Sequence, residues 1–306
     1  MKHYVGVDIG GTRLKAGLVN DNHQVVREAV AWLEPGDKTE EGLIARVAAL
    51  VNQVREGVRP VLVGIGVAGV IDRRSGVVAR SPNFPTWRNF AVQRRLQDLT
   101  GFAVLVDNDA NCVIAGEALM GARAGRDLIG LTLGTGVGGG LVLNGQVWRG
   151  ANGMGGELGH IVADPAGPLC GCGGRGCLEM YPSVNGLRHQ ARLREVAVDL
   201  EAPNLPELLA NLARGGDATA QACFDAAGVA LGRVLGGLLN VFDIKTVLLA
   251  GGVSGTWDRM EAATWAAIRG ASFPEIADGV EIYVGTLGER AGIYGAALQW
   301  KLQPHD

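Results

Sequence analysis

The amino-acid sequence predicts an α/β fold with two domains. Strand-like apolar runs alternate with helical patterns along most of the chain, which is typical of α/β proteins. The length of 306 residues fits two domains of ordinary size better than one. A strand that runs into a glycine-and-threonine turn occurs twice, at residues 7–12 and 131–136, and an apolar strand follows each turn. These similar segments suggest two related halves, each beginning with a hairpin.

The first half is predicted to open with a hairpin and to continue with helices and strands in turn. Residues 39–56 carry apolar side chains on one helical face, and a second helix is expected to follow Asp109 and to end near residue 120. Alternation and apolar runs predict strands at Tyr4–Ile9, Arg13–Val19, Gln24–Val30, Val61–Val67 and Val104–Val106.

The second half is predicted to start with another hairpin and then to become largely helical. A strand from Leu128 runs into Gly134-Thr135-Gly136, residues 140–143 return, and Asn144-Gly145 is a hairpin turn sequence. The apolar stretch within the helical region 186–243 is interrupted by Arg233 and Asn240, so we expect a buried helix there instead of a membrane span. Later elements are expected as strands at Thr246–Ala250 and Val280–Val284 and a final helix at Ala291–Lys301.

The boundary between the two domains is expected near residues 116–127. We therefore assign residues 1–118 to an N-terminal domain, with the C-terminal helix 291–306 returning to it, and residues 119–290 to a C-terminal domain.

Composition and charge exclude several classes of protein. A net charge of −3 leaves no basic footprint for nucleic acid or an anionic membrane. The first residues run directly into a strand pattern without a secretory signal, so a cytoplasmic protein is expected. The chain has 48 glycines, and they form short clusters at residues 10–11, 134–140, 171–176 and 251–252, where they indicate tight turns or close approach to a ligand.

The glycine turns predict a phosphate-binding site. Gly134-x-Gly136-x-x-Gly139 matches the dinucleotide fingerprint, but a strand follows it where that fingerprint requires a helix, and no P-loop sequence is present. Two glycine hairpins with free N–H groups and a threonine hydroxyl suit phosphate oxygens. Asp8, at the end of an apolar strand, suits a magnesium ion held partly through water. Two ordinary tight hairpins are the alternative interpretation.

Polar residues follow the strand that ends near Val106. Asp107-Asn108-Asp109-Ala110-Asn111 stands between this strand and a helix, where sites form in α/β sheets. Helix capping would explain one of these residues but not all of them. We expect Asp109 to accept the proton of a substrate hydroxyl and Asn108 to help hold the hydroxyls.

The segment from Gly155 to Glu179 predicts a metal site. His160, Cys170, Cys172 and Cys177 form a Cys₃His set suited to tetrahedral zinc, with no open position for a metal-activated water. A disulfide is the competing interpretation, but disulfides are rare in the cytosol and a Cys-x-Cys pair is too cramped to bridge easily. The remaining thiols, Cys112 and Cys223, are expected to be buried small side chains.

Two carboxylates flank this segment. Glu157 precedes His160 by three residues, and Glu179 follows Cys177 by two. A zinc-ordered loop would fix both carboxylates, which could then hydrogen-bond a hydroxyl-rich sugar. Exposure to solvent is the default for glutamate, but we place Glu179 in a pocket because cysteines and Met180-Tyr181 surround it.

These motifs together resemble the ROK family of sugar kinases, regulators and uncharacterised reading frames. The resemblance runs from Val5 to about Ala297, and its cysteine segment is specific to the family. Residues 81–87 and 150–153 look most like the bacterial glucokinases of that family, although Thr86 stands where those members often carry glycine. The matching motifs are Asp8-Ile9-Gly10-Gly11-Thr12, Asn108-Asp109-Ala110-Asn111, Gly134 to Gly140, Gly156-Glu157-Leu158-Gly159-His160 and Cys170 to Glu179.

The resemblance implies an actin-like fold of duplicated ribonuclease H-like domains with ATP in the cleft, and a homodimer or homotetramer. It implies Asp109 as general base and zinc on His160, Cys170, Cys172 and Cys177, with the second ring nitrogen of His160 left for the sugar. The sugar ligands it implies are Asn83, Asn108, Asp109, Glu157, His160 and Glu179, to which we add Gly69. The residues expected to contact Mg-ATP are Asp8, Gly10, Gly11, Thr12, Lys15, Thr135, Gly136, Gly252 and Val253.

The function expected on this basis is phosphorylation of glucose to glucose 6-phosphate. N-acetylmannosamine, fructose, mannose and allose are alternative substrates, and polyphosphate is an alternative donor. A catalytically silent sugar sensor and a zinc-binding interaction module are the competing classes. A DNA-binding role is not expected, because the first phosphate turn leaves no room ahead of it for a helix-turn-helix.

Overall fold

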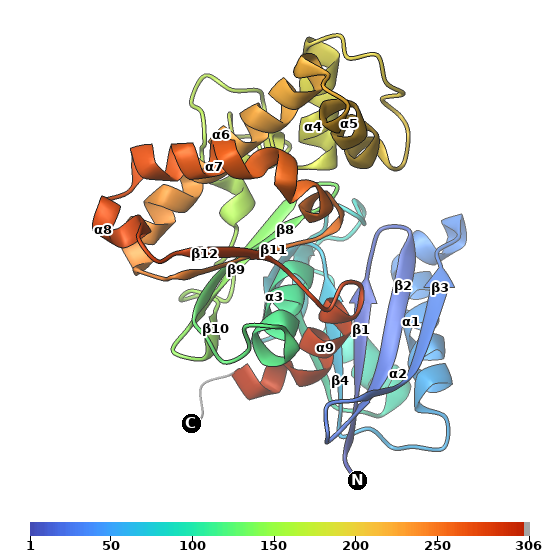
Figure 1. Cartoon of the computed structure of the whole chain (residues 1–306). Coiled ribbons are helices and arrows are strands. Elements are labelled where there is room, and N and C mark those ends of the chain that lie inside the picture. The colour runs from blue at the N-terminus through green and yellow to red at the C-terminus, as the bar shows by residue number, and fades with distance from the viewer. Residues whose placement is uncertain (303–306) are drawn as a thin grey trace. The chain divides into compact units, whose positions relative to one another are not determined.

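The computed structural model describes residues 1–302 and contains two large mixed sheets with helices around them (Figure 1). One sheet has the strand order β3-β2-β1-β4-β7 and the other has the order β10-β9-β8-β11-β12. In the first sheet, the antiparallel strands β3, β2 and β1 are extended by the parallel strands β4 and β7. In the second sheet, β10 pairs antiparallel with β9, and β11 runs parallel to β8 and to β12. This shared order confirms the duplication that the glycine-and-threonine turns suggested.

The strands of the first sheet lie close to the expected positions. β1 and β2 pair in antiparallel register, and Asp8 lies opposite Lys15. β4 runs parallel to β1 and to β7. The bounds are β1 His3–Ile9, β2 Arg13–Asn20, β3 Val25–Trp32, β4 Leu62–Val67 and β7 Val104–Asn108, with a small separate hairpin of β5 Val70–Asp72 and β6 Val77–Arg80.

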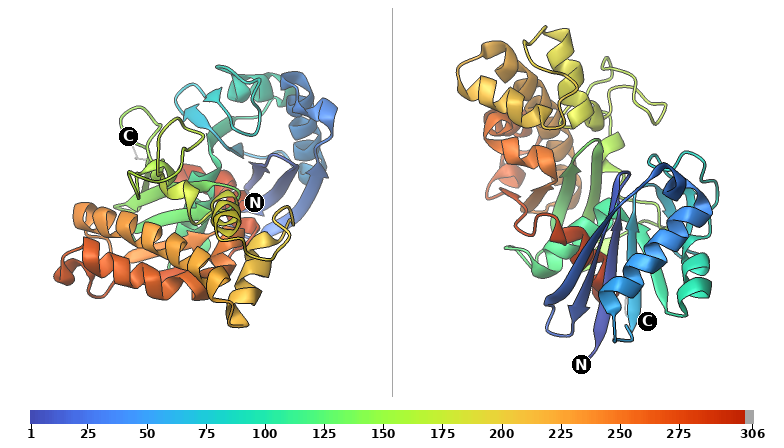
Figure 2. Two further views of the ribbon diagram at one scale, coloured as in Figure 1. Left: turned by 90° about the horizontal axis from the view of Figure 1, so that it is seen from above. Right: turned by 90° about the vertical axis from the view of Figure 1, so that its right-hand side faces the viewer.

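Helices cover the first sheet on both faces (Figure 2, right). α1 (Glu40–Arg55) buries the apolar face that the sequence predicted, beginning at the N-cap Thr39, against β2 and β3. α9 (Arg290–Leu298) covers β1 and β4 on the other face through Ile293 and Ala297. α2 (Val92–Thr100) and α3 (Asp109–Met120) complete this part. The final predicted helix ends earlier than expected: Gln299–Leu302 form a 3₁₀ turn, and residues 303–306 lie outside the described chain.

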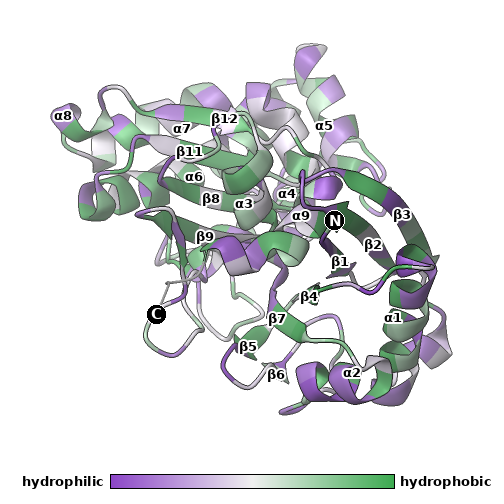
Figure 3. Cartoon of the chain, turned by 90° about the horizontal axis from the view of Figure 1, so that it is seen from below, coloured by the Kyte–Doolittle hydropathy of each residue, from purple (hydrophilic) through white to green (hydrophobic). Residues whose placement is uncertain are grey.

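The second sheet carries the larger helical region. Its strands β8 and β9 are apolar, as their green colour shows in Figure 3. The hairpin turn after β9 has left-handed backbone at Asn144 and Gly145, as expected. The bounds are β8 Leu128–Leu133, β9 Val137–Leu143, β10 Gln146–Trp148, β11 Thr246–Ala250 and β12 Glu281–Val284. The helices are α4 Val184–Leu193, α5 Leu205–Arg214, α6 Ala218–Phe242, α7 Trp257–Ala271 and α8 Pro274–Ala277, of which α7 and α8 were not predicted.

Helix α6 is the core helix of this region. It contacts α7 along its length, and Gly228 allows the close approach, since a Cβ there would lie 2.6 Å from the Met260 carbonyl. Among the described residues it is the one helix long and apolar enough to cross a membrane, yet 61% of its most apolar window is buried within the structure. Burial of this kind is ordinary for a core helix, in agreement with the expectation from the sequence.

The chain divides into two compact units. Residues 1–126, 140–156 and those from 286 onward form unit 1, and residues 127–139 and 157–285 form unit 2. This division places residues 119–126, 140–156 and 286–290 with unit 1, whereas we had expected them in the second domain. Side-chain contacts explain the difference: Arg149 binds Asp107, and Glu117 accepts the Leu287 N–H at 2.8 Å.

Candidate functional site

The turn between β1 and β2 carries the first group of predicted nucleotide ligands. The turn is closed by the Gly10 N–H, which donates to the Arg13 carbonyl at 3.0 Å. A Cβ on Gly11 would lie 3.1 Å from the Asn83 side chain. The structure therefore places Asn83, a predicted sugar ligand, directly beside the predicted phosphate turn.

Charged side chains surround Asp8 at the end of β1. Lys15 Nζ lies 4.0 Å from the Asp8 carboxylate and 3.5 Å from Glu289, which also binds Arg13. Burial raises the pKa of Asp8, and the charges of Lys15 and Arg13 only partly offset this effect. Gly292 at the start of α9 leaves room for the carboxylate, since a Cβ there would lie 3.2 Å from it. A partly buried carboxylate of raised pKa is suited to an incoming cation, which would favour its ionised form.

The junction of β7 and α3 holds the predicted base. Asn108 is the N-cap of α3, and its side-chain oxygen accepts the N–H groups of Ala110 at 2.9 Å and Asn111 at 3.2 Å. Its amide nitrogen donates to the Gly69 carbonyl at 3.1 Å. Helix capping thus accounts for the side-chain oxygen of Asn108, as the alternative interpretation required. Its amide nitrogen brings Asn108 into contact with Gly69. Asp109 is the first residue of α3 and is half-buried.

Asp107, just before this junction, is buried in an ionic cluster that sequence reasoning missed. Its carboxylate accepts hydrogen bonds from Arg73 Nε at 3.1 Å and Arg149 Nε at 2.8 Å, and Asn111 donates to it at 3.3 Å. Arg73 also donates to Gln299 at 3.3 Å. Burial, and the charge of Arg149, lower the pKa of Arg73. The position of Asp107 at the end of an apolar strand indicates that a buried cation is needed to pair with it. The sequence does not indicate that Arg73 and Arg149 are the residues that supply this charge.

The turn between β8 and β9, in unit 2, carries the second group of predicted phosphate ligands. Thr135 is exposed at its tip, and the Gly134 N–H donates to the Gly136 carbonyl at 2.9 Å. The Val137 N–H is already taken, because it donates to Glu179 Oε2 at 3.1 Å. Within residues 1–302, the N–H groups of Thr135 and Gly136 have no hydrogen-bond acceptor. These two N–H groups are the ones that sequence reasoning assigned to the phosphates.

The third glycine turn follows β11. Gly251 has a left-handed backbone, with φ of 89°, and Gly252 after it is exposed. Val253 is fully buried, so a contact between this residue and a nucleotide would have to use its backbone.

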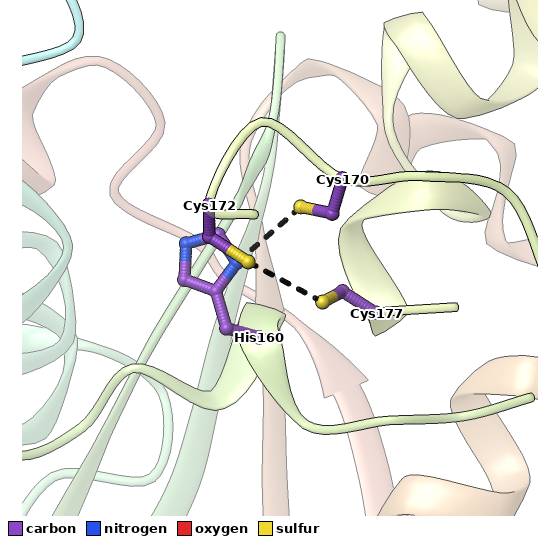
Figure 4. A group of neighbouring side chains, drawn as sticks. All are labelled: His160, Cys170, Cys172 and Cys177. Atoms are coloured by element: carbon purple, nitrogen blue, oxygen red, sulfur yellow. Dashed lines mark hydrogen bonds between the residues drawn. The ribbon is translucent and has the colours of Figure 1, made fainter. Parts of the chain in front are cut away.

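His160, Cys170, Cys172 and Cys177 come together in unit 2 (Figure 4). Their ligand atoms all lie within 4.8 Å of one another. His160 Nδ1 is 3.6 Å from Cys170 Sγ, and the Sγ atoms of Cys172 and Cys177 are 3.6 Å apart. Such a separation is far too long for a disulfide, whose sulfurs are about 2.05 Å apart.

The spacing of these four atoms fits zinc. Tetrahedral zinc with Zn–S bonds of about 2.3 Å requires ligand atoms about 3.8 Å apart. Cys170 and Cys177 are buried, and burial raises the pKa of the Cys170 thiol to about 12. A bound zinc ion would reverse this preference, since it holds cysteine as the thiolate. Figure 4 shows the second ring nitrogen of His160 pointing away from the three thiols.

The two predicted carboxylates differ in their surroundings. Glu157 is exposed, and its carbonyl accepts the His160 N–H at 3.1 Å. Glu179 is half-buried. One of its carboxylate oxygens accepts the Val137 N–H, and the other lies 3.6 Å from Cys170 Sγ. Cys112 and Cys223 are buried, as expected.

Comparison with known proteins places these features in context. A match to the ROK family spans residues 4–303. The chain is 36% identical to the glucokinase of Thermotoga maritima, over 96% of this chain and 95% of that protein. It is 37% identical to the N-acetylmannosamine kinase of Citrobacter koseri, but over only 61% of this chain and 64% of that protein.

A solved structure is similar over nearly the whole chain. This is a ROK family glucokinase from Streptomyces griseus in complex with glucose and AMPPNP, with a TM-score of 0.80 and 33% identity, covering 96% of this chain and 98% of that one.

Proposed function

This chain belongs to the ROK family, and on that premise we propose that it transfers the γ-phosphoryl group of Mg-ATP to a hexose, with glucose as the preferred substrate. The observation that carries the proposal is the near-complete match to two glucokinases, one of them holding glucose and an ATP analogue. All residues that the resemblance assigned to the reaction are present, and within each unit several of them lie side by side.

In the proposed reaction, Asp109 accepts the proton of the sugar 6-hydroxyl. The hydroxyl oxygen then forms a bond to the γ-phosphorus, and the bond from that phosphorus to the bridging oxygen of ADP breaks. The products are glucose 6-phosphate and ADP. Asn83, Asn108, Glu157, His160 and Glu179, with Gly69, are the proposed sugar ligands, and orientation of the hydroxyl by them would supply much of the rate gain.

The proposed nucleotide ligands are the three glycine turns. The free N–H groups of Thr135 and Gly136 would bind phosphate oxygens, together with Gly10, Gly11 and Thr12. Asp8 would hold the magnesium ion, which neutralises charge on the phosphates, and Lys15 would add a positive charge. Gly252 and the backbone of Val253 would lie near the adenosine.

The role of Asp109 can be tested with Asp109→Asn, which removes the base with little change in shape. We expect kcat to fall by about 10²- to 10⁴-fold while glucose still binds. Asp98→Asn is the matched control, because Asp98 is exposed on α2 and forms a surface ion pair with Arg94 at 3.8 Å. A kcat for Asp109→Asn close to that of the control would reject Asp109 as the base.

N-acetylmannosamine is the second candidate substrate, since the partial match to a kinase of that sugar favours it. A coupled ADP-release assay with glucose, mannose, fructose, allose, N-acetylglucosamine and N-acetylmannosamine distinguishes the candidates. Polyphosphate in place of ATP tests the donor in the same assay. Sugar binding without turnover on any donor would instead identify a silent sensor.

The remaining parts of the proposal concern the metal ion, the oligomeric state and the cellular location. The Cys₃His cluster would hold a structural zinc ion that orders the loop between Glu157 and Glu179. We further propose a homodimer or homotetramer in the cytoplasm, acting on small molecules and on neither nucleic acid nor membrane.

A further inference from the structure

Residues 179–185, which follow the last proposed zinc ligand Cys177, form three hydrogen bonds with the turn between β8 and β9. The Val184 N–H donates to the Gly134 carbonyl at 2.9 Å, and the Asn185 N–H donates to the Thr135 carbonyl at 3.4 Å. The third bond runs from the Val137 N–H to Glu179 Oε2 at 3.1 Å. Only this third bond is made by a side chain, so it is the one that a substitution can remove.

The Glu179 carboxylate also fills the space beside the turn. A Cβ built on Gly136 would lie 2.2 Å from Glu179 Oε2, closer than any real contact. A side chain at position 136 would therefore have to displace the Glu179 carboxylate, whereas the backbone itself does not demand glycine, because Gly136 has no left-handed φ. Gly134, two residues earlier, would place its Cβ 4.0 Å from the nearest atom.

The backbone of Glu179 is itself fixed. Its carbonyl accepts the Ser183 hydroxyl at 2.6 Å, and Ser183 in turn caps α4 by accepting the Gly186 N–H at 2.8 Å. The buried side chain of Leu178 precedes it. A carboxylate on so constrained a backbone can hold the turn in one conformation.

We propose that Glu179 is a positioning residue for the β8–β9 turn, in addition to its proposed contact with the sugar. By taking the Val137 N–H, it leaves the N–H groups of Thr135 and Gly136 as the free donors of the turn and holds them in place. Its second oxygen lies 3.6 Å from Cys170 Sγ. The Glu179 carboxylate therefore connects the segment that carries the proposed zinc ligands, residues 160–177, to the β8–β9 turn. The part that concerns phosphate rests on the proposed function.

The first test needs no ligand. Hydrogen exchange of the peptide containing residues 134–138 should become faster in Glu179→Ala, because the Val137 N–H loses its acceptor. Glu179→Gln keeps an acceptor oxygen and should restore protection. Unchanged exchange in Glu179→Ala would overturn the proposal.

The second test measures the affinity for a non-hydrolysable ATP analogue with no sugar present. A residue that served the sugar alone would leave this affinity unchanged. We expect Glu179→Ala to weaken it by about tenfold, the effect of one charge-assisted hydrogen bond, and Glu179→Gln to weaken it much less. Equal binding by Glu179→Ala would mean that the carboxylate does not act on the phosphate turn, and tighter binding would mean that it repels phosphate; either result would overturn the proposal.

A double-substitution cycle separates this role from general damage to the turn. Gly136→Ala should displace the carboxylate and speed exchange of the same peptide, but should add little in the Glu179→Ala background. Gly134→Ala is the steric control and should leave exchange at Val137 unchanged. Additive effects of Gly136→Ala and Glu179→Ala would contradict the proposal.

The two proposals fail in different ways. If the unaltered chain binds no nucleotide, the proposed kinase function fails, and exchange still decides whether Glu179 orders the turn. If the unaltered chain binds nucleotide and Glu179→Ala binds it equally well, only the positioning role fails.

Discussion

Replacement of Asp107 by alanine should strongly destabilise unit 1. Its carboxylate is 4% exposed and is bound by two guanidinium groups, with Arg149 Nη2 at 2.7 Å and Arg73 Nε at 3.1 Å. The arginine side chains are 10% and 16% exposed, so water can replace the carboxylate only poorly. Removing one partner from a buried ion pair costs about 3–5 kcal/mol. A loss of that size corresponds to a fall of about 10 °C in the unfolding temperature.

Calorimetry of Asp107→Ala beside Asp98→Ala measures this effect. Asp98 is 72% exposed and its partner Arg94 is 83% exposed, so loss of that pair should cost less than about 0.5 kcal/mol. Adding Arg73→Met to Asp107→Ala should recover part of the loss, because one unpaired cation is then removed. Equal unfolding temperatures for the two aspartate variants would refute the argument that Asp107 neutralises buried charge.

Two further predictions concern the metal and Asp8. Metal analysis should find about one zinc ion per chain, and chelation should lower the unfolding temperature; a folded, fully active chain without zinc would contradict this. Asp8→Asn should raise the unfolding temperature at pH 7, because burial raises the pKa of Asp8 and so penalises the folded state above the usual carboxyl value of 3.8. This gain should disappear as the pH falls below that value, and a less stable Asp8→Asn chain at pH 7 would show that the pairing with Lys15 outweighs the cost of burial.

Local patterns in the sequence predicted most of the fold. The apolar alternation of β1 and β2, and the glycine turns that end β1 and β8, are properties of a few neighbouring residues. Elements with weaker patterns were missed. β5 has only three residues, too few to show a period, and one of the three side chains that α7 buries is the polar Thr264, which weakens its apolar pattern.

The candidate site was predictable to the extent that its parts are close in sequence. The four proposed zinc ligands fall within 18 residues, and the structure brings them together. The contacts of Asp107 with Arg149 and of Val137 with Glu179 each join residues 42 positions apart. Contacts between residues so far apart in the sequence depend on how whole strands and loops pack. A single sequence does not show which residues this packing brings together.

The most direct test of the proposed kinase function is product analysis with Mg-ATP and glucose. We expect equal amounts of ADP and glucose 6-phosphate from the zinc-loaded chain, and neither product from Asp109→Asn above a trace. Absence of any sugar phosphate with all six sugars of the panel, from a folded and zinc-loaded chain, would contradict the account.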